Sequence, residues 1–411
     1  MTERRLRVLT ISSHPIQYGA PLFRIMAAHP KLDYQVAYCS LRGAEAGYDP
    51  EFGAHVQWDV PLLDGYKWTH IPNRGSGAEG FWDWRNTGLW KFIRQGKFDV
   101  VISHVGYVRA TFWIAYFAAR SVGIPFLFGT DASNIEPRDE SNLKLTVKRV
   151  LWPAVFGLSG QVLTASSAGR DMMVSLGFPA DRVSMTLDTV DNDWWFAQAS
   201  AVDRDLARRS LGFLPNEKAI LFCAKLQSWK RPMDLLRAFA SAAIPDAKLV
   251  FAGDGAQRAE LETEAAARGI QNKVEFLGFV NQSQLPRLYK AADLMVIPSR
   301  YEPFGLVVNE SMLCGCPVIA SDRVGAVRDL ITHGETGYVY SCGDVESLAS
   351  TIRQAVEDPV RLNAIRTNAL ERIRAWSPQA SAEALVSALE SAVSRRRPGS
   401  RAVAVSSETY T

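Results

Sequence analysis

The sequence lacks any long apolar run. Its most apolar stretch, residues 111–119, lies between Arg109 and Arg120 and is too short to span a bilayer. The chain also opens without an apolar leader, because the run over residues 6–13 has the length of a strand and not that of a signal peptide. These absences argue against an ordinary transmembrane or secreted protein, and we expect a cytoplasmic location.

The sequence also lacks a large excess of positive or negative charge. The formal net charge is +3, and the four arginines after residue 394, set against one glutamate, account for it. Nucleic-acid-binding faces need clustered Lys and Arg side chains. The nearly neutral body of the chain therefore argues against a nucleic-acid partner.

Motifs for metal binding are weak. The five cysteines include no CxxC spacing, and buried thiols in a reducing compartment explain them more simply than a metal site. Two Asp-x-Asp triplets occur, at residues 191–193 and 203–205. The first lies at the expected domain junction and the second opens an amphipathic helix, where Asp is a common cap. We expect no metal ion.

Short β-branched runs alternate with longer helical patterns, which is typical of parallel α/β layers. We expect two doubly wound Rossmann-like domains that face each other across a cleft, over residues 1–195 and 205–375. A helix over residues 377–394 is expected to pack back on the first domain, before a disordered tail at 395–411. The connection over residues 43–90 is too long for an ordinary turn. Strands are expected at residues 7–12, 35–39, 100–104, 126–129, 161–165, 183–187, 219–224, 248–252, 274–277, 294–298, 317–320 and 337–340.

Most of the chemistry is concentrated in residues 297–310, Ile-Pro-Ser-Arg-Tyr-Glu-Pro-Phe-Gly-Leu-Val-Val-Asn-Glu. A helix starting near Gly305 would place Glu302 before it and Glu310 about one and a half turns into it. The unpaired amides at a helix start suit a diphosphate, and acceptor-only carboxylates suit sugar hydroxyls. A helix-terminal glutamate and a surface glutamate would explain the same spacing without a ligand.

This segment, followed by Met-x-x-Gly-x-Pro-Val-Ile-Ala-Ser, closely resembles the donor-site signature of glycosyltransferase family 4, whose members have the GT-B fold. The resemblance covers most of the C-terminal half and extends more thinly over the rest. It implies a retaining hexosyltransferase that needs no metal ion or cofactor, because the nucleotide-sugar is itself a substrate. It also implies that Glu310 holds the ribose, that Glu302 serves catalysis at the sugar hydroxyls, and that Phe304, Gly305 and Leu306 line the donor site.

Residues 222–231, Phe-Cys-Ala-Lys-Leu-Gln-Ser-Trp-Lys-Arg, are similar to the family segment in which Arg and, five residues later, Lys grip the donor diphosphate. Lys225 and Lys230 stand at these positions. Lysine at the first position supplies the charge but not the bidentate fork of a guanidinium group. Two solvated surface lysines are the alternative. Gly253, in Val-Phe-Ala-Gly-Asp-Gly, matches the glycine turn of the family.

The first half carries weaker matches. Gly19 is the glycine that remains in the loop after the first strand, where the family keeps a Gly-rich loop facing the donor. His104 ends a strand, as does the family histidine near the transferred sugar, although a satisfied structural histidine would look the same. Asp131, at another strand end, and His14 are candidates for binding the acceptor.

These observations predict transfer of a sugar from a nucleotide-sugar donor to a sugar, lipid-linked or polysaccharide acceptor, as in polysaccharide biosynthesis. Two alternatives stay open: a nucleotide-sugar epimerase of the same fold, and a non-catalytic scaffold that keeps the fold. A dinucleotide-dependent oxidoreductase is disfavoured, because Gly253-Asp-Gly255 is followed by Arg258 where the fingerprint needs a third glycine.

Peripheral contact with the inner face of a membrane is a further hypothesis. It rests on a basic and aromatic stretch made of Lys144, Lys148, Arg149, Trp152 and Phe156, which would suit an anionic lipid surface. Pro153 interrupts the pattern, and an ordinary packed helix is the favoured interpretation.

Overall fold

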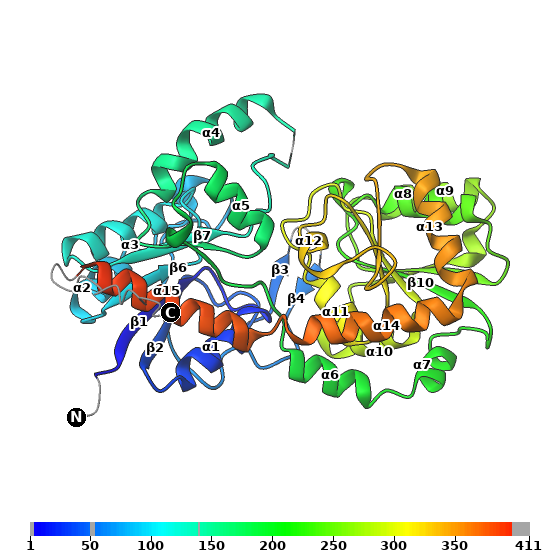
Figure 1. Ribbon diagram of the computed structural model, residues 1–411, viewed down its shortest axis with the longest axis horizontal. Coiled ribbons are helices and arrows are strands. Elements are labelled where there is room, and N and C mark those ends of the chain that lie inside the picture. The colour runs from blue at the N-terminus through cyan, green and yellow to red at the C-terminus, as the bar shows by residue number, and fades with distance from the viewer. Residues whose placement is uncertain (1–3, 50–53, 139, 397–411) are drawn as a thin grey trace, which may run out of the picture.

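Two α/β domains lie side by side in the computed structural model, which describes residues 4–49, 54–138 and 140–396 (Figure 1). Each domain contains one parallel sheet covered by helices, so the predicted fold class is confirmed. Each of the twelve predicted strands is present, with ends that differ by a few residues. The tail expected to be disordered lies outside the described residues from position 397 onward.

Seven parallel strands form the sheet of the N-terminal domain, in the order β5-β2-β1-β6-β7-β8-β9. Helices cover both faces, so a central strand such as β1 is an almost continuous apolar run whose residues Val8, Leu9 and Ile11 are fully buried. The elements of this domain are β1 (Leu6–Ser12), α1 (Gly19–Ala28), β2 (Leu32–Tyr38), β5 (Lys67–His70), η1 (Phe81–Asp83), α2 (Gly88–Gln95), β6 (Val100–Ser103), α3 (Ala110–Ser121), β7 (Phe126–Thr130), α4 (Asn142–Phe156), β8 (Val162–Thr164), α5 (Ser167–Ser175), η2 (Ala180–Arg182) and β9 (Val183–Met185).

The long connection over residues 43–90 contains structure that the sequence pattern did not predict. It supplies the edge strand β5, which pairs with β2, and an antiparallel hairpin of β3 (Gly47–Asp49) and β4 (Ala54–Val56). Beyond the hairpin, this connection reaches the C-terminal domain. Ser283 donates its backbone N–H to a carboxylate oxygen of Asp59 at 3.1 Å, and the Trp58 and Phe279 rings are 6.1 Å apart.

Six parallel strands form the sheet of the C-terminal domain, in the order β12-β11-β10-β13-β14-β15. The order reverses between β10 and β13, which leaves a crevice at the carboxyl ends of these strands. The elements are α6 (Asn192–Ser200), α7 (Arg204–Ser210), β10 (Lys218–Cys223), η3 (Ser228–Lys230), α8 (Pro232–Ala242), β11 (Ala247–Ala252), α9 (Arg258–Ala267), η4 (Gln271–Lys273), β12 (Val274–Gly278), η5 (Gln282–Gln284), α10 (Leu285–Ala291), β13 (Leu294–Ile297), α11 (Val307–Leu313), β14 (Val318–Ser321), α12 (Val327–Leu330), β15 (Tyr338–Tyr340), α13 (Val345–Glu357) and α14 (Pro359–Arg374).

The chain passes between the domains twice. The expected boundary at residue 195 falls inside α6, but Trp195 and Ala199 of this helix are buried in the core of the C-terminal domain. The structural boundary therefore precedes α6, whose first turn is capped by the Asp191 side chain. The second passage leads into α15 (Pro378–Arg396), which packs on α1 and β9 of the N-terminal domain.

Hydrogen bonds join the two segments in which the chain crosses between the domains. The Asn192 side-chain amide donates to the carbonyls of Ile373 and Trp376, at 3.3 and 3.2 Å. Within the part of the chain that the structure describes, no helix combines the length and apolar character needed to cross a bilayer.

Candidate active site

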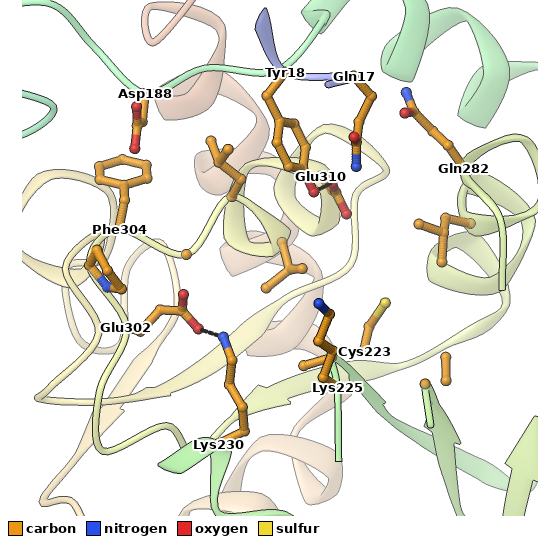
Figure 2. Close-up of a pocket in the computed structure, with 18 of the residues that line it drawn as sticks. Gln17, Tyr18, Asp188, Cys223, Lys225, Lys230, Gln282, Glu302, Phe304 and Glu310 are labelled. Atoms are coloured by element: carbon orange, nitrogen blue, oxygen red, sulfur yellow. Dashed lines mark hydrogen bonds and ion pairs between the residues drawn. The ribbon is translucent and has the colours of Figure 1, made fainter. Parts of the chain in front are cut away.

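A cavity of about 420 Å³ lies between the domains, at the carboxyl ends of both sheets (Figure 2). The C-terminal domain lines it with the loops that follow β10, β11 and β13, and the N-terminal domain with the loops that follow β1, β7 and β9. This interdomain cavity brings together most of the predicted donor-site residues. They are Lys225, Lys230, Gly253, Glu302, Phe304, Gly305, Leu306 and Glu310, joined by the acceptor candidate Asp131.

Glu310 projects from α11 into the upper part of the cavity and is held there by two tyrosines. The Tyr18 hydroxyl donates to Oε1 at 3.0 Å and the Tyr289 hydroxyl donates to Oε2 at 2.9 Å. The residue is almost entirely buried, and burial raises the pKa of its carboxyl to about 7, although both tyrosine hydrogen bonds oppose this shift. Tyr18 belongs to the N-terminal domain, so this carboxylate also connects the two domains.

Glu302 lies on the opposite side of the cavity and forms an ion pair with Lys230 (Figure 2). The side chains of both residues are largely shielded from solvent. Lys225 points into the cavity from below Glu310 in the view of Figure 2. Two ammonium groups and two carboxylates thus surround one space, an arrangement suited to a ligand with both a diphosphate and several hydroxyls.

Two glycines allow the backbone to take the path that this site needs. Gly305 has a φ of +104°, and a Cβ at this position would lie 3.0 Å from Cγ of Glu302. Gly253 has a φ of +144°, and a Cβ there would lie 2.0 Å from the Ala224 carbonyl oxygen. Any other residue at these positions would be strained and would displace the loops that carry Glu302 and Lys225.

A second cavity of about 410 Å³ lies within the N-terminal domain and adjoins the first. Asp131 and Asp188 line both cavities, and His104 lines this N-terminal cavity. The His104 side chain is open to the cavity, but the protein atoms around the ring lower its pKa below the usual value, so the imidazole is neutral at pH 7.

The two aspartates form an acidic cluster with Glu302. Desolvation and, secondarily, Asp131 raise the pKa of Asp188 to about 7. Asp131 is open to the cavity, yet desolvation by the surrounding protein atoms and, secondarily, Glu302 raise its pKa as well. The interdomain cavity and the N-terminal cavity therefore meet at carboxyl groups that bind protons more tightly than free ones.

The sequence did not single out several residues of these cavities. Gln17, Tyr18 and Asp188 reach the interdomain cavity only because the domains face each other. Gly19 begins α1 next to Tyr18, and the His14 ring contacts the neighbouring Ser13 hydroxyl at 2.9 Å. Neither Gly19 nor His14 lines the interdomain or the N-terminal cavity.

The two Asp-x-Asp triplets have structural roles. Asp191 accepts the backbone N–H of Trp194 at 3.1 Å, and Asp203 accepts that of Leu206 at 2.8 Å. Both are therefore helix caps, as the sequence indicated for Asp203. Among the residues that the structure describes, no group of three or more His, Cys, Asp or Glu side chains is arranged to hold a metal ion.

Comparison with known proteins supports one family. The sequence model described as "Glycosyl transferases group 1" matches residues 203–372. An uncharacterized glycosyltransferase of Methanocaldococcus jannaschii is 37% identical over 203 residues, which span 49% of this chain and 52%, about half, of that relative. A D-inositol 3-phosphate glycosyltransferase of Catenulispora acidiphila is 29% identical over 325 residues, which span 74% of this chain and 75% of that protein.

Solved structures show the same architecture over nearly the whole chain. The Anabaena protein HepE, in a crystal structure with UDP and glucose, is similar with a TM-score of 0.72 and 22% sequence identity. The similarity covers 94% of this chain and all of HepE. At this identity the comparison establishes the shared fold.

Proposed function

Because the chain belongs to the glycosyl transferases group 1 family and has the GT-B fold, we propose that it is a retaining, metal-independent hexosyltransferase of glycosyltransferase family 4. It would transfer a sugar from a nucleotide-sugar to a carbohydrate, lipid-linked or polysaccharide acceptor, as in polysaccharide biosynthesis. One observation carries the proposal: a single cavity assembles Glu302, Glu310, Lys225 and Lys230 from the two chain segments that follow β10 and β13 of one sheet.

Each of these side chains has a role in this proposal. Glu310 holds the ribose hydroxyls, because a carboxylate accepts two of them at once. Lys225 and Lys230 neutralise the negative charge that grows on the departing diphosphate, and such charge stabilisation is a large term in catalysis. Glu302 contacts the hydroxyls of the transferred sugar. The transition state resembles an oxocarbenium ion, which the cavity must shield from water.

The N-terminal cavity is the proposed acceptor site. It adjoins the donor site at Asp131 and Asp188, where an acceptor hydroxyl would meet the donor sugar. His104 lines this cavity in its neutral form, so it can accept or donate a hydrogen bond to the acceptor without carrying charge.

A thermal-shift panel with UDP, GDP, ADP, CMP and dTDP tests the proposal, because a ligand that binds only the folded state raises its apparent stability. UDP is the first choice, since HepE has been crystallised with UDP and with UDP-glucose. We expect one nucleotide to stabilise the protein, Glu310→Gln to abolish that shift, and the exposed control Glu357→Gln to retain it. If no nucleotide stabilises the native protein, the scaffold interpretation replaces this proposal.

The nucleotide found in this way directs the assay of chemistry. Incubation of the matching nucleotide-sugar with and without acceptor separates transfer from epimerisation, because an epimerase converts its donor without any acceptor. NMR spectroscopy of the product reports the anomeric configuration, which a retaining enzyme preserves.

A further inference from the structure

Helix α4 carries an apolar ridge that faces solvent. Leu143, Val147, Val150 and Leu151 are 75%, 49%, 76% and 42% exposed. They recur at intervals of four, three and one, so they lie along one side of the helix. Large apolar side chains exposed singly are normal, but a contiguous row of four on one helix face marks an interaction surface. In Figure 1, α4 stands at the outer edge of the N-terminal domain.

The charges on α4 have one sign. The helix contains Lys144, Lys148 and Arg149, and it contains no acidic residue. Lys144 and Arg149 are exposed, whereas Lys148 is half-buried, with its ammonium 3.3 Å from the Ile135 carbonyl oxygen. A helix with an exposed apolar ridge and basic flanks is complementary to an anionic lipid surface, where apolar side chains enter the headgroup boundary.

The inner side of the same helix reaches the N-terminal cavity. Trp152 and Phe156 are buried and line that cavity together with His104. The Trp152 indole donates to the Tyr107 hydroxyl at 2.7 Å, which fixes the helix on the domain. Pro153 lies inside the helix without ending it. The packed-helix interpretation from the sequence is thus correct for the buried side of α4. It does not account for the exposed apolar side chains on the other side.

We propose that α4 docks the protein on an anionic membrane surface through Leu143, Val147 and Val150, with Lys144 and Arg149 beside them. Docking in this way places the N-terminal cavity, which the buried Trp152 and Phe156 of α4 help to line, one helix away from the lipid surface. Of the acceptor classes proposed above, this placement favours the lipid-linked one. That last step rests on the proposed function, whereas the docking itself does not.

Vesicle flotation tests the docking. We expect the full-length protein to float with vesicles of phosphatidylcholine and phosphatidylglycerol, to float much less with phosphatidylcholine alone, and to be released at high salt. The double variant Leu143→Glu/Val150→Glu should lose at least 10-fold in bound fraction. The control Val360→Glu, on an 81% exposed residue of α14 in the other domain, should bind as the native protein does.

Two results would overturn the proposal. One is absence of the native protein from the lipid fraction, or equal binding by the double variant. The other is a native dimer that the double variant converts to a monomer, which would assign the ridge to a second copy of the chain. The melting curve of the same double variant, recorded without lipid and both with and without nucleotide, shows from its unfolding transition that the variant is folded. It also keeps a failure of docking distinct from a failure of the proposed function.

Discussion

Replacing Glu310 with glutamine should stabilise the folded protein while it abolishes nucleotide binding. The carboxyl group is buried, and burial raises its pKa from 4.5 to about 7. One pKa unit corresponds to about 1.4 kcal/mol. Above pH 7 the ionised carboxylate therefore lowers the free energy of unfolding by about 3 kcal/mol compared with a side chain whose charge state does not change on folding.

The raised pKa of Glu310 also predicts how the stability of the protein changes with pH. Between pH 4.5 and 7 the folded state keeps the Glu310 proton while the unfolded state loses it, so stability falls as pH rises through this window. Glutamine has nearly the same shape and can bond to both Tyr18 and Tyr289, but it carries no charge. Glu310→Gln should thus gain about 3 kcal/mol over the native protein at pH 8 and only about 1 kcal/mol at pH 5.

Melting curves of both proteins from pH 5 to pH 8, without nucleotide, measure this difference. A gain of about 3 kcal/mol corresponds to a rise in melting temperature of about 5 °C or more at pH 8. A difference that stays constant with pH would show that the charge of Glu310 is not its cause. A variant less stable than the native protein at pH 8 would refute the claim that this carboxylate is retained for binding at the expense of stability.

Three other substitutions have defined outcomes. Gly305→Ala should destabilise the protein by about 1–3 kcal/mol in denaturant unfolding and lower kcat, because the φ of +104° suits glycine and the new Cβ would press on Glu302. Tyr18→Phe should tighten nucleotide binding several-fold in calorimetry. The substitution removes a hydrogen bond to one oxygen of Glu310, which the ribose must otherwise replace. Weaker binding would instead show that Tyr18 contacts the nucleotide-sugar directly. Lys230→Met should lower kcat by about 100-fold in steady-state assays, with a smaller change in KM, and an unchanged kcat would remove Lys230 from the charge-stabilising role.

The sequence predicted those parts of the molecule that depend on local pattern. Parallel strands buried on both faces are runs of apolar residues, so β1 and β10 could be located from composition alone. Glu302 and Glu310 could be paired because both lie in one short segment that runs from the end of β13 into α11. Asp188 could not be found in this way. It reaches Asp131 only through the folding of β7, β8 and β9 into one sheet, and no periodicity encodes that approach.

Contacts between the two domains also could not be predicted from the sequence. Tyr18 and Glu310 are 292 residues apart in the chain, and their hydrogen bond depends on how the two sheets face each other. The edge strand β5 was also missed, because its residues are mostly exposed and lack the apolar alternation that marks a strand. In both cases tertiary packing, and not local propensity, decides the structure.

Helix α15 has a consequence for the order in which the protein is made. Its residues Ala382, Leu385 and Leu389 complete the same core cluster as Val8 and Phe23 near the start of the chain. During synthesis the N-terminal sheet emerges first, but the apolar face beside β1 and β2 stays uncovered until α15 leaves the ribosome. The C-terminal domain, which is continuous from α6 to α14, can fold in the meantime. We therefore expect the N-terminal domain to finish folding after the C-terminal domain. A nascent chain stalled before residue 378 should expose an apolar surface that chaperones bind.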